Sequence, residues 1–182
     1  MADNKKAVFL DRDGVICKEK SYITSVNQLE IFQFAIDAVK MLKDSGWLCI
    51  VITNQSAVAR GMMTEDELER IHEVIYNTLP VDRIYYCPHH PEKAAYDSPY
   101  RVKCDCRKPG TGMILSAARD FNIDLNQSFF VGDRSSDIMA GKKAGLKTVL
   151  VKTGYDISGI EVEPDFVFDN IMQTVHFITG KQ

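Results

Sequence analysis

The chain has 182 residues, 45% of them hydrophobic and 26% charged, which is typical of a globular protein with a substantial core. The net charge of −3 and the lack of a long basic run disfavour nonspecific nucleic-acid binding, and no apolar run approaches the roughly 20 residues of a membrane helix. The first residues lack the apolar region of a signal peptide, so we expect one cytoplasmic domain over residues 1–182, with neither nucleic-acid nor membrane partners.

Short apolar runs alternate with helical periodicity along the chain. In chain order they predict a strand at 6–11, a helix at 35–46, a strand at 47–54, a helix at 64–79, a strand at 82–87, a helix at 110–123, a strand at 128–133, a helix at 135–145, a strand at 147–153 and a strand–helix step from 165. Thr64 and Glu67 form a capping-box pattern that begins the second helix. This alternation predicts an α/β fold, a doubly wound parallel sheet with helices on both faces.

Two segments interrupt the alternation. Residues 15–34 show weak periodicity, and residues 88–109 are rich in proline, histidine, cysteine and charge. Long connections without secondary structure are uncommon in compact domains and are often functional. We therefore expect these two segments to carry functional residues.

Polar side chains follow several predicted strands. They are Asp11 and Asp13 after the first strand, Thr53 and Asn54 at the end of the second, and Asp133 after FFVG. In an open parallel sheet, ligands bind at the carboxyl ends of the strands. Asp11 and Asp13 are two residues apart, so in a strand they would face the same side, and Gly14 permits a turn after them. Converging carboxylates predict a Mg²⁺ site.

The same carboxylates suit covalent phosphoryl chemistry. One aspartate can attack phosphorus as a nucleophile, while a second acts as general acid and then as general base. Lys108 in RKP would add positive charge at the same edge of the sheet.

The motifs DRDG, TN, RKP and GDRSSD, in this order, resemble the four motifs of haloacid dehalogenase-type (HAD) phosphotransferases over residues 9–154. The resemblance implies that Mg²⁺ is bound by Asp11, by Asp13 through its backbone carbonyl and by Asp133, with Asp137 orienting metal-bound waters. It implies a Mg²⁺-dependent phosphomonoester hydrolase that forms an aspartyl-phosphate.

The resemblance also assigns catalytic roles. It makes Asp11 the nucleophile and Asp13 the acid and base. Thr53 would hydrogen-bond the transferring phosphoryl group, and Lys108 would neutralise charge on Asp11 and on the phosphate. These charges would compensate carboxylates that are otherwise costly to bury.

Cysteine and histidine gather in residues 87–109, a segment that we call the zinc loop. The predicted ligands are Cys87, His89, Cys104 and Cys106. Three thiolates and one imidazole suit a closed, structural zinc site. His90 is an alternative fourth ligand that spacing does not exclude, although the family resemblance favours His89. The site would fix the loop that carries Arg107 and Lys108.

DRDGVI, TNQSAVARG, CPHHP, CDCRKP and GDRSSDIMAG resemble the heptose bisphosphate phosphatase and histidinol-phosphate phosphatase subgroup. The segment after the first motif is short, and a helix, a strand and the zinc loop take up the later insertion, so we expect an open site without a separate cap domain. The resemblance implies an enzyme that removes the 7-phosphate of a heptose 1,7-bisphosphate. The predicted substrate contacts are Glu19, Tyr22, Thr53, Asn54, Gln55, Ser56, Arg107, Lys108 and Arg134. Arg107 and Arg134 are the candidates for the second phosphate.

The sequence departs from this subgroup at Val15, Cys17 and Ser21, which leaves the sugar and its anomer open. Histidinol phosphate or another small sugar phosphate is the alternative substrate. A non-catalytic phosphosugar-binding module and a polynucleotide 3′-end phosphatase are further hypotheses. The intact catalytic motifs disfavour the first, and the missing basic groove disfavours the second. The chain is expected to be a monomer, because no coiled coil or apolar surface stripe is visible in its sequence.

Overall fold

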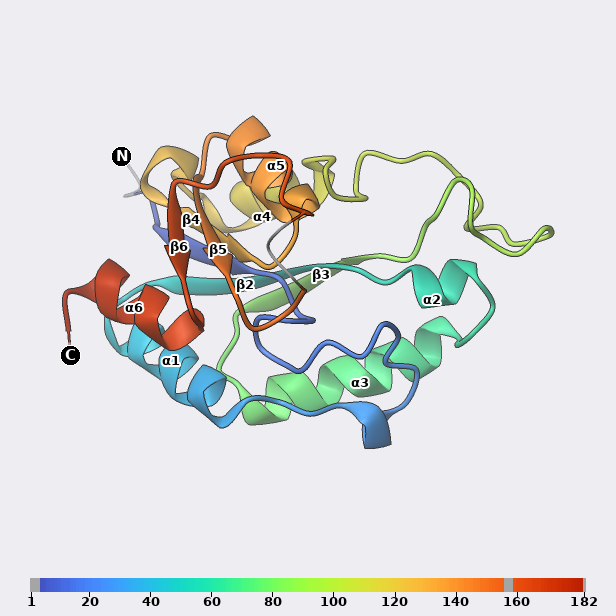
Figure 1. The fold of residues 1–182 in the computed structure, drawn as a ribbon, viewed down its shortest axis with the longest axis horizontal. Coiled ribbons are helices and arrows are strands. Elements are labelled where there is room, and N and C mark those ends of the chain that lie inside the picture. Colours follow the sequence, from blue (N-terminus) through green and yellow to red (C-terminus); the bar gives the residue numbers. More distant parts are fainter. Residues whose placement is uncertain (1–3, 156–158, 182) are drawn as a thin grey trace.

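The computed structural model describes residues 4–155 and 159–181 and contains one parallel sheet (Figure 1). Its strand order is β3-β2-β1-β4-β5-β6, and every neighbouring pair is parallel. The strands are β1 (Ala7–Leu10), β2 (Leu48–Asn54), β3 (Arg83–Cys87), β4 (Phe129–Gly132), β5 (Lys147–Val151) and β6 (Phe166–Phe168). The predicted fold class is confirmed.

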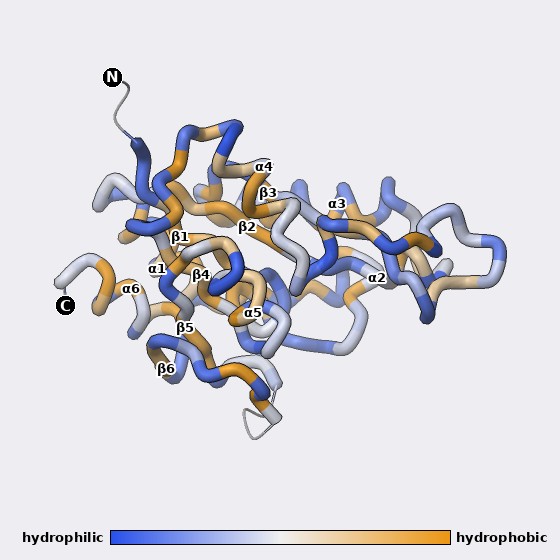
Figure 2. Tube along the Cα trace, turned by 90° about the horizontal axis from the view of Figure 1, so that it is seen from above, coloured by the Kyte–Doolittle hydropathy of each residue, from blue (hydrophilic) through white to orange (hydrophobic). Residues whose placement is uncertain are grey.

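Helices cover both faces of the sheet. One face packs against α1 (Gln33–Asp44), α3 (Glu65–Thr78) and α6 (Ile171–Thr179), and the other against α4 (Gly112–Phe121) and α5 (Ser135–Lys143). Seen from above, hydrophobic residues concentrate along the central strands (Figure 2). The short helix α2 (Ser56–Ala59) follows β2 directly. The described part of the chain has no helix long and apolar enough to cross a membrane.

The predicted elements are all present, with small shifts at their ends. The capping box of Thr64 and Glu67 is confirmed: the Thr64 hydroxyl accepts from the Glu67 backbone N–H, and the Glu67 carboxylate accepts from that of Thr64. The periodicity did not predict α2 or the 3₁₀ turns Val26–Gln28 and Leu125–Gln127, which are too short to show a helical repeat. The first strand ends at Leu10, so strand alternation does not orient Asp11 and Asp13 as predicted.

The two interrupting segments are irregular, as predicted. Residues 15–32, which we call the flap, contain only the 3₁₀ turn and isolated bridges, and residues 88–109 contain no helix or strand. In Figure 1 the zinc loop extends away from the sheet beyond the end of β3. Neither segment forms a separate cap domain in the described part of the chain.

The order in which the chain adds strands to the sheet reverses at its centre, between β1 and β4. From β1 the chain continues to β2 and β3 on one side, then crosses to β4, β5 and β6 on the other. Such a switch point leaves a crevice at the carboxyl ends of the two central strands. Asp11 follows β1 and Asp133 follows β4, so the fold places both at this crevice.

Candidate active site

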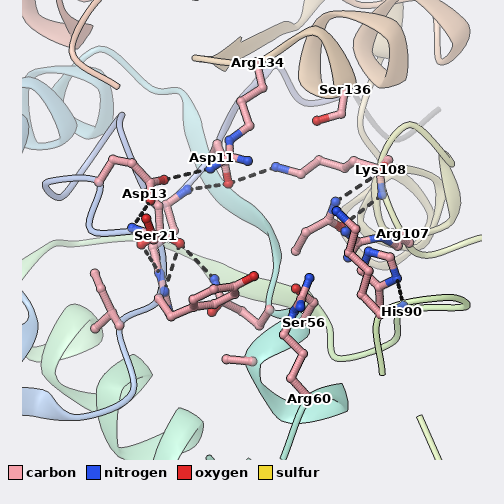
Figure 3. A pocket seen from close by; sticks show the side chains of 18 of the residues that line it. Asp11, Asp13, Ser21, Ser56, Arg60, His90, Arg107, Lys108, Arg134 and Ser136 are labelled. Atoms are coloured by element: carbon pink, nitrogen blue, oxygen red, sulfur yellow. Dashed lines mark hydrogen bonds and ion pairs between the residues drawn. The ribbon is translucent and has the colours of Figure 1, made fainter. Parts of the chain in front are cut away.

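A polar cavity of about 400 Å³ opens at this crevice (Figure 3). The flap, α2, the zinc loop and the segment after β4 form its walls. The predicted site residues that line it are Asp11, Asp13, Glu19, Tyr22, Asn54, Gln55, Ser56, Arg107, Lys108 and Arg134. Thr53 and Asp133 are buried behind the lining. The topology thus gathers side chains from four distant segments at one place.

Lys108 is buried at the floor of the cavity. Its Nζ lies 2.8 Å from Asp11 Oδ1 and 2.7 Å from Asp137 Oδ1, and it donates to the Ile52 carbonyl at 2.8 Å. Burial lowers the pKa of Lys108, but the two carboxylates outweigh burial and raise it. The Asn54 side chain holds the Lys108 backbone, accepting from its N–H at 3.0 Å and donating to its carbonyl at 3.1 Å. Asn54 therefore positions the lysine.

Three carboxylates, Asp11, Asp133 and Asp137, bring oxygen atoms within 4.8 Å of one another. Lys108 is their only ion-pair partner among the described residues. Burial raises the pKa of Asp11 to about 7 and that of Asp133 to about 8. Asp133 Oδ1 is buried and has no hydrogen-bond partner in the described chain. An all-oxygen cluster whose negative charge a single lysine compensates only in part fits Mg²⁺. The Asp13 carboxylate lies outside this cluster.

Two glycines let the backbone close around Asp133. Gly14 has φ +80°, and a Cβ there would collide with the Asp133 carboxylate. A Cβ at Gly154 would collide with the same carboxylate. The close approach of both backbones fixes Asp133 at the end of β4.

The Asp13 carboxylate forms a bidentate ion pair with the neighbouring Arg12. The buried Arg12 guanidinium donates to Asp13 Oδ1 from Nε at 3.1 Å and to Oδ2 from NH2 at 2.9 Å. Gln55 Nε2 donates to Asp13 Oδ2 at 3.0 Å and to Thr53 Oγ1 at 2.7 Å. Burial raises the pKa of Asp13, but the charge and hydrogen bonds of Arg12 outweigh burial and lower it. Asp13 is therefore charged in this arrangement.

The flap side of the cavity is organised by arginines. Arg134 NH2 lies 3.0 Å from Glu19 Oε2, and its guanidinium carbon stacks 3.8 Å from the centre of the Tyr155 ring. The guanidinium carbon of Arg60 lies 5.3 Å from the centre of the Tyr22 ring. The predicted contacts Glu19, Tyr22 and Arg134 thus lie on the cavity wall, and two of them pair with each other.

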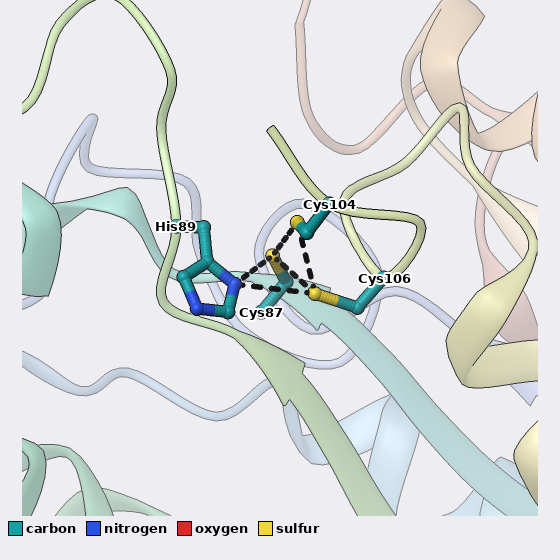
Figure 4. A group of neighbouring side chains, drawn as sticks. All are labelled: Cys87, His89, Cys104 and Cys106. Carbon is teal, nitrogen blue, oxygen red and sulfur yellow. Dashed lines mark hydrogen bonds between the residues drawn. The ribbon is translucent and has the colours of Figure 1, made fainter. Parts of the chain in front are cut away.

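The predicted zinc ligands converge (Figure 4). Cys106 Sγ lies 3.0 Å from Cys87 Sγ, 3.1 Å from Cys104 Sγ and 3.3 Å from His89 Nδ1. Sulfur atoms around a tetrahedral zinc ion would be roughly 3.8 Å apart, so the cluster is slightly tighter than such a site. Three sulfurs and one imidazole nitrogen form a closed donor set that could hold a metal ion.

His90 does not join this cluster. Its Nδ1 accepts from the backbone N–H groups of Glu92, at 3.3 Å, and Lys93, at 3.1 Å, and the residue lines the active-site cavity. Arg107 NH1 donates to the His89 carbonyl at 3.2 Å. Of the two histidines, His89 is therefore the one placed to be a ligand.

Several polar residues of the cavity were not predicted from the sequence, among them Arg12, Arg60, Lys93, Ser136 and Tyr155. Arg12 and Arg60 lie within the motifs DRDG and TNQSAVARG, so an arginine inside a site motif was the available signal. Lys93 lies in the segment 88–109, which was expected to carry functional residues, but nothing marked this lysine in particular, and Tyr155 lies in a loop without such a signal.

Comparison with known proteins agrees with this geometry. A family model described as HAD-hydrolase-like matches residues 105–174. The chain is 40% identical over 182 residues to a D-glycero-beta-D-manno-heptose-1,7-bisphosphate 7-phosphatase of Haemophilus ducreyi, covering 96% of this chain and 98% of that protein. The enzyme of the same name from Pasteurella multocida is 41% identical, covering 97% and 98%.

Solved structures give the same picture. A D,D-heptose 1,7-bisphosphate phosphatase from B. bronchiseptica, complexed with magnesium and phosphate, superposes with a TM-score of 0.84 at 30% identity, covering 95% of this chain and 97% of that one. The corresponding phosphatase from Burkholderia thailandensis has a TM-score of 0.71 at 23% identity, covering 97% and 100%, and supports the fold alone.

Proposed function

We propose that this chain, which belongs to the family of D-glycero-β-D-manno-heptose-1,7-bisphosphate 7-phosphatases, removes the 7-phosphate of that bisphosphate. The observation that carries the proposal is the Asp11 carboxylate held 2.8 Å from the Lys108 ammonium at the floor of a cavity with several cationic side chains on its walls. A phosphate ester entering this cavity would meet a nucleophile and compensating positive charge.

Asp11 attacks phosphorus, and the bond between phosphorus and the sugar oxygen breaks. Asp13, which takes up a proton from solvent as the ester binds, gives that proton to the leaving oxygen, and an aspartyl-phosphate remains on Asp11. Asp13 then takes a proton from water, the water oxygen attacks phosphorus, and phosphate leaves with Asp11 restored. Arg12 favours the charged, base form of Asp13, whereas an incoming phosphate adds negative charge that favours the acid form. Thr53 and Lys108 stabilise the transferring group.

Mg²⁺ would be held by Asp11, Asp133 and the Asp13 backbone carbonyl, and Asp137 would orient its waters. When bound, it supplies charge that neutralises the phosphoryl oxygens. Support comes from the unpartnered Asp133 oxygen and from the raised pKa of Asp11 and Asp133.

The sugar would lie between the flap and α2. Glu19, Tyr22, Gln55 and Ser56 would contact it, and Arg107 would meet the second phosphate. Arg134 is the other candidate for that phosphate, although it already pairs with Glu19. The β-anomer is proposed because the similar enzymes carry that anomer in their names.

The cluster of Cys87, His89, Cys104 and Cys106 would hold one structural zinc ion. Its closed donor set leaves no open position for substrate. It would fix the segment that carries Arg107 and Lys108. We propose further that the enzyme is a cytoplasmic monomer of one domain.

Histidinol phosphate is the weaker substrate because it brings a cationic amine to this cavity. Arg60, Lys93 and Arg107 would repel that amine. Among the described residues of the lining, Glu19 is the one acid besides Asp11 and Asp13, and it pairs with Arg134.

The test is a side-by-side assay of both anomers of the heptose 1,7-bisphosphate, the heptose 7-phosphate and histidinol phosphate, with kcat/KM measured for each. We expect the β-bisphosphate to be preferred. A tenfold preference for histidinol phosphate would contradict the proposed substrate, and activity retained in Asp11→Asn would contradict the proposed nucleophile.

A further inference from the structure

One wall of the cavity carries more positive charge than the proposed chemistry has used. Arg60, Lys93 and Arg107 all line it on the side of the zinc loop and α2. Figure 3 places Arg60 beyond Ser56 as seen from Asp11, away from the nucleophile. The group therefore lies where the far end of a bound substrate would be.

Among the described residues, no carboxylate forms an ion pair with these side chains. The two arginines of the cavity that lie outside this wall have carboxylate partners: Arg12 pairs with Asp13, and Arg134 pairs with Glu19. Within residues 4–155 and 159–181, no carboxylate forms an ion pair with Arg60, and the buried Nε of Arg60 has no hydrogen-bond partner. A partly buried, unpaired guanidinium is costly unless an anion reaches it.

Arg60 shares this wall with Arg107, an arginine that has no carboxylate partner in the described part of the chain. Arg107 donates to a backbone carbonyl, that of His89, at 3.2 Å. Like charges held together in a cavity form a site for an anion with more than one charge.

The scaffold holds this wall in place. Arg60 is the C-cap residue of α2, and the Ala95 N–H donates to the Ala59 carbonyl at 2.9 Å, which joins the zinc loop to the end of α2. The Lys93 N–H donates to His90 Nδ1 and so shapes the turn that presents the lysine. The Tyr22 ring of the flap lies within cation–π distance of the Arg60 guanidinium, 5.3 Å from the ring centre to the guanidinium carbon. Three separate segments therefore fix the position of Arg60.

We propose that Arg60, supported by Lys93, binds the second phosphate of the substrate beside Arg107 and thereby sets the preference for a sugar bisphosphate over a sugar monophosphate. This inference rests on the proposed function. A guanidinium presents several donors in a planar fork that matches phosphate oxygens. Binding energy from this remote phosphate would orient the ester at Asp11, so it would raise kcat as well as lower KM.

The test compares kcat/KM for the heptose 1,7-bisphosphate with kcat/KM for the heptose 7-phosphate, which lacks the second phosphate. Arg60→Met should lower this ratio at least tenfold, equivalent to about 1.4 kcal/mol. Arg60→Lys, which keeps the charge and loses the fork, should give an intermediate ratio. Arg70→Met removes the same charge from an exposed position on α3 and should leave the ratio unchanged.

The outcomes separate the two proposals. If the unmodified enzyme does not prefer the bisphosphate, the proposed function is wrong and this inference with it. Suppose that the unmodified enzyme does prefer the bisphosphate, but Arg60→Met changes the ratio of the two kcat/KM values by less than twofold, for instance because it lowers both values equally. Arg60 then only supports the flap, and this inference alone is wrong. Should Arg60→Met fail to fold by circular dichroism, Lys93→Met, at an exposed position, must lower the ratio at least threefold for the inference to stand.

Discussion

Replacing Lys108 by methionine would leave the carboxylate cluster without its cation. Methionine has a similar length, so the change removes charge with little loss of volume. The ammonium group has three partners, the carboxylates of Asp11 and Asp137 and the Ile52 carbonyl, all within 2.8 Å. All three lose a buried donor, and the carboxylates keep their mutual repulsion.

Removing one partner of a buried ion pair costs about 3–5 kcal/mol of folding free energy. We expect a loss of this size for Lys108→Met in metal-free protein near pH 8. Turnover should fall by about 10²–10³ or more, because one group that stabilises transition-state charge is lost.

The loss of stability should depend on pH with a defined sign. Burial raises the folded-state pKa of Asp11 to about 7 and that of Asp133 to about 8, above the unfolded value of roughly 3.9. The folded protein therefore binds protons more tightly than the unfolded chain, and stability falls as pH rises through these values. Without Lys108 the pKa of Asp11 rises further, so the destabilisation should grow from pH 5 to pH 8.

The assay is urea unfolding followed by circular dichroism at pH 5.5, 7 and 8.5, with a chelator present. Lys40→Met, at an exposed position of α1, is the matched control. A destabilisation below about 1 kcal/mol at pH 8.5 would refute the argument, given the cost of a broken buried pair. So would a destabilisation that shrinks as pH rises.

Three other results are expected. Asp11→Asn should lower the rate of phosphate release by about 10²-fold or more, because an amide is a far weaker nucleophile than a carboxylate. Its circular dichroism spectrum should be unchanged. Near-normal turnover would exclude the aspartyl-phosphate. Mg²⁺ should raise the melting temperature more at pH 8 than at pH 6, because protons compete with the metal for Asp11 and Asp133 below their pKa values. An equal rise in melting temperature at the two pH values would count against these two ligands. Elemental analysis should find about one zinc per chain, lost in Cys104→Ser but kept in Cys49→Ser, whose thiol lies outside the cluster; equal zinc in both variants would contradict the assignment.

The sequence predicted the sheet and the floor of the site well because both follow from local patterns. Continuous apolar runs marked the buried strands, and a polar cluster at the end of each central strand marked the crevice. Asp11 and Asp133 are separated by most of the chain, yet their position after β1 and β4 was enough to place them together. The Cys and His spacing likewise predicted a cluster that forms.

The cavity walls could not be predicted in the same way, because they depend on side-chain partners from different loops. The pairing of Arg134 with Glu19 joins segments that no periodicity relates. His89 lies in the cluster and His90 does not, because His90 accepts from two backbone N–H groups in its own turn. Arg12 follows Asp11 directly, but its fork onto Asp13 depends on the chain leaving the strand at Leu10.

The zinc loop contributes to both the wall and the floor of the cavity, through Arg107 and Lys108. It has few buried apolar side chains, Ala94 among them, so packing alone contributes little to its order. Its fixed points are the four-residue cluster, the Ala95–Ala59 hydrogen bond and the clamp of Asn54 on Lys108. The cluster, through Cys106, and the Asn54 clamp, on Lys108, hold the residues on either side of Arg107. A metal ion in the cluster would therefore position the lysine at the nucleophile and the arginine at the far end of the substrate together, so that losing the ion should impair both.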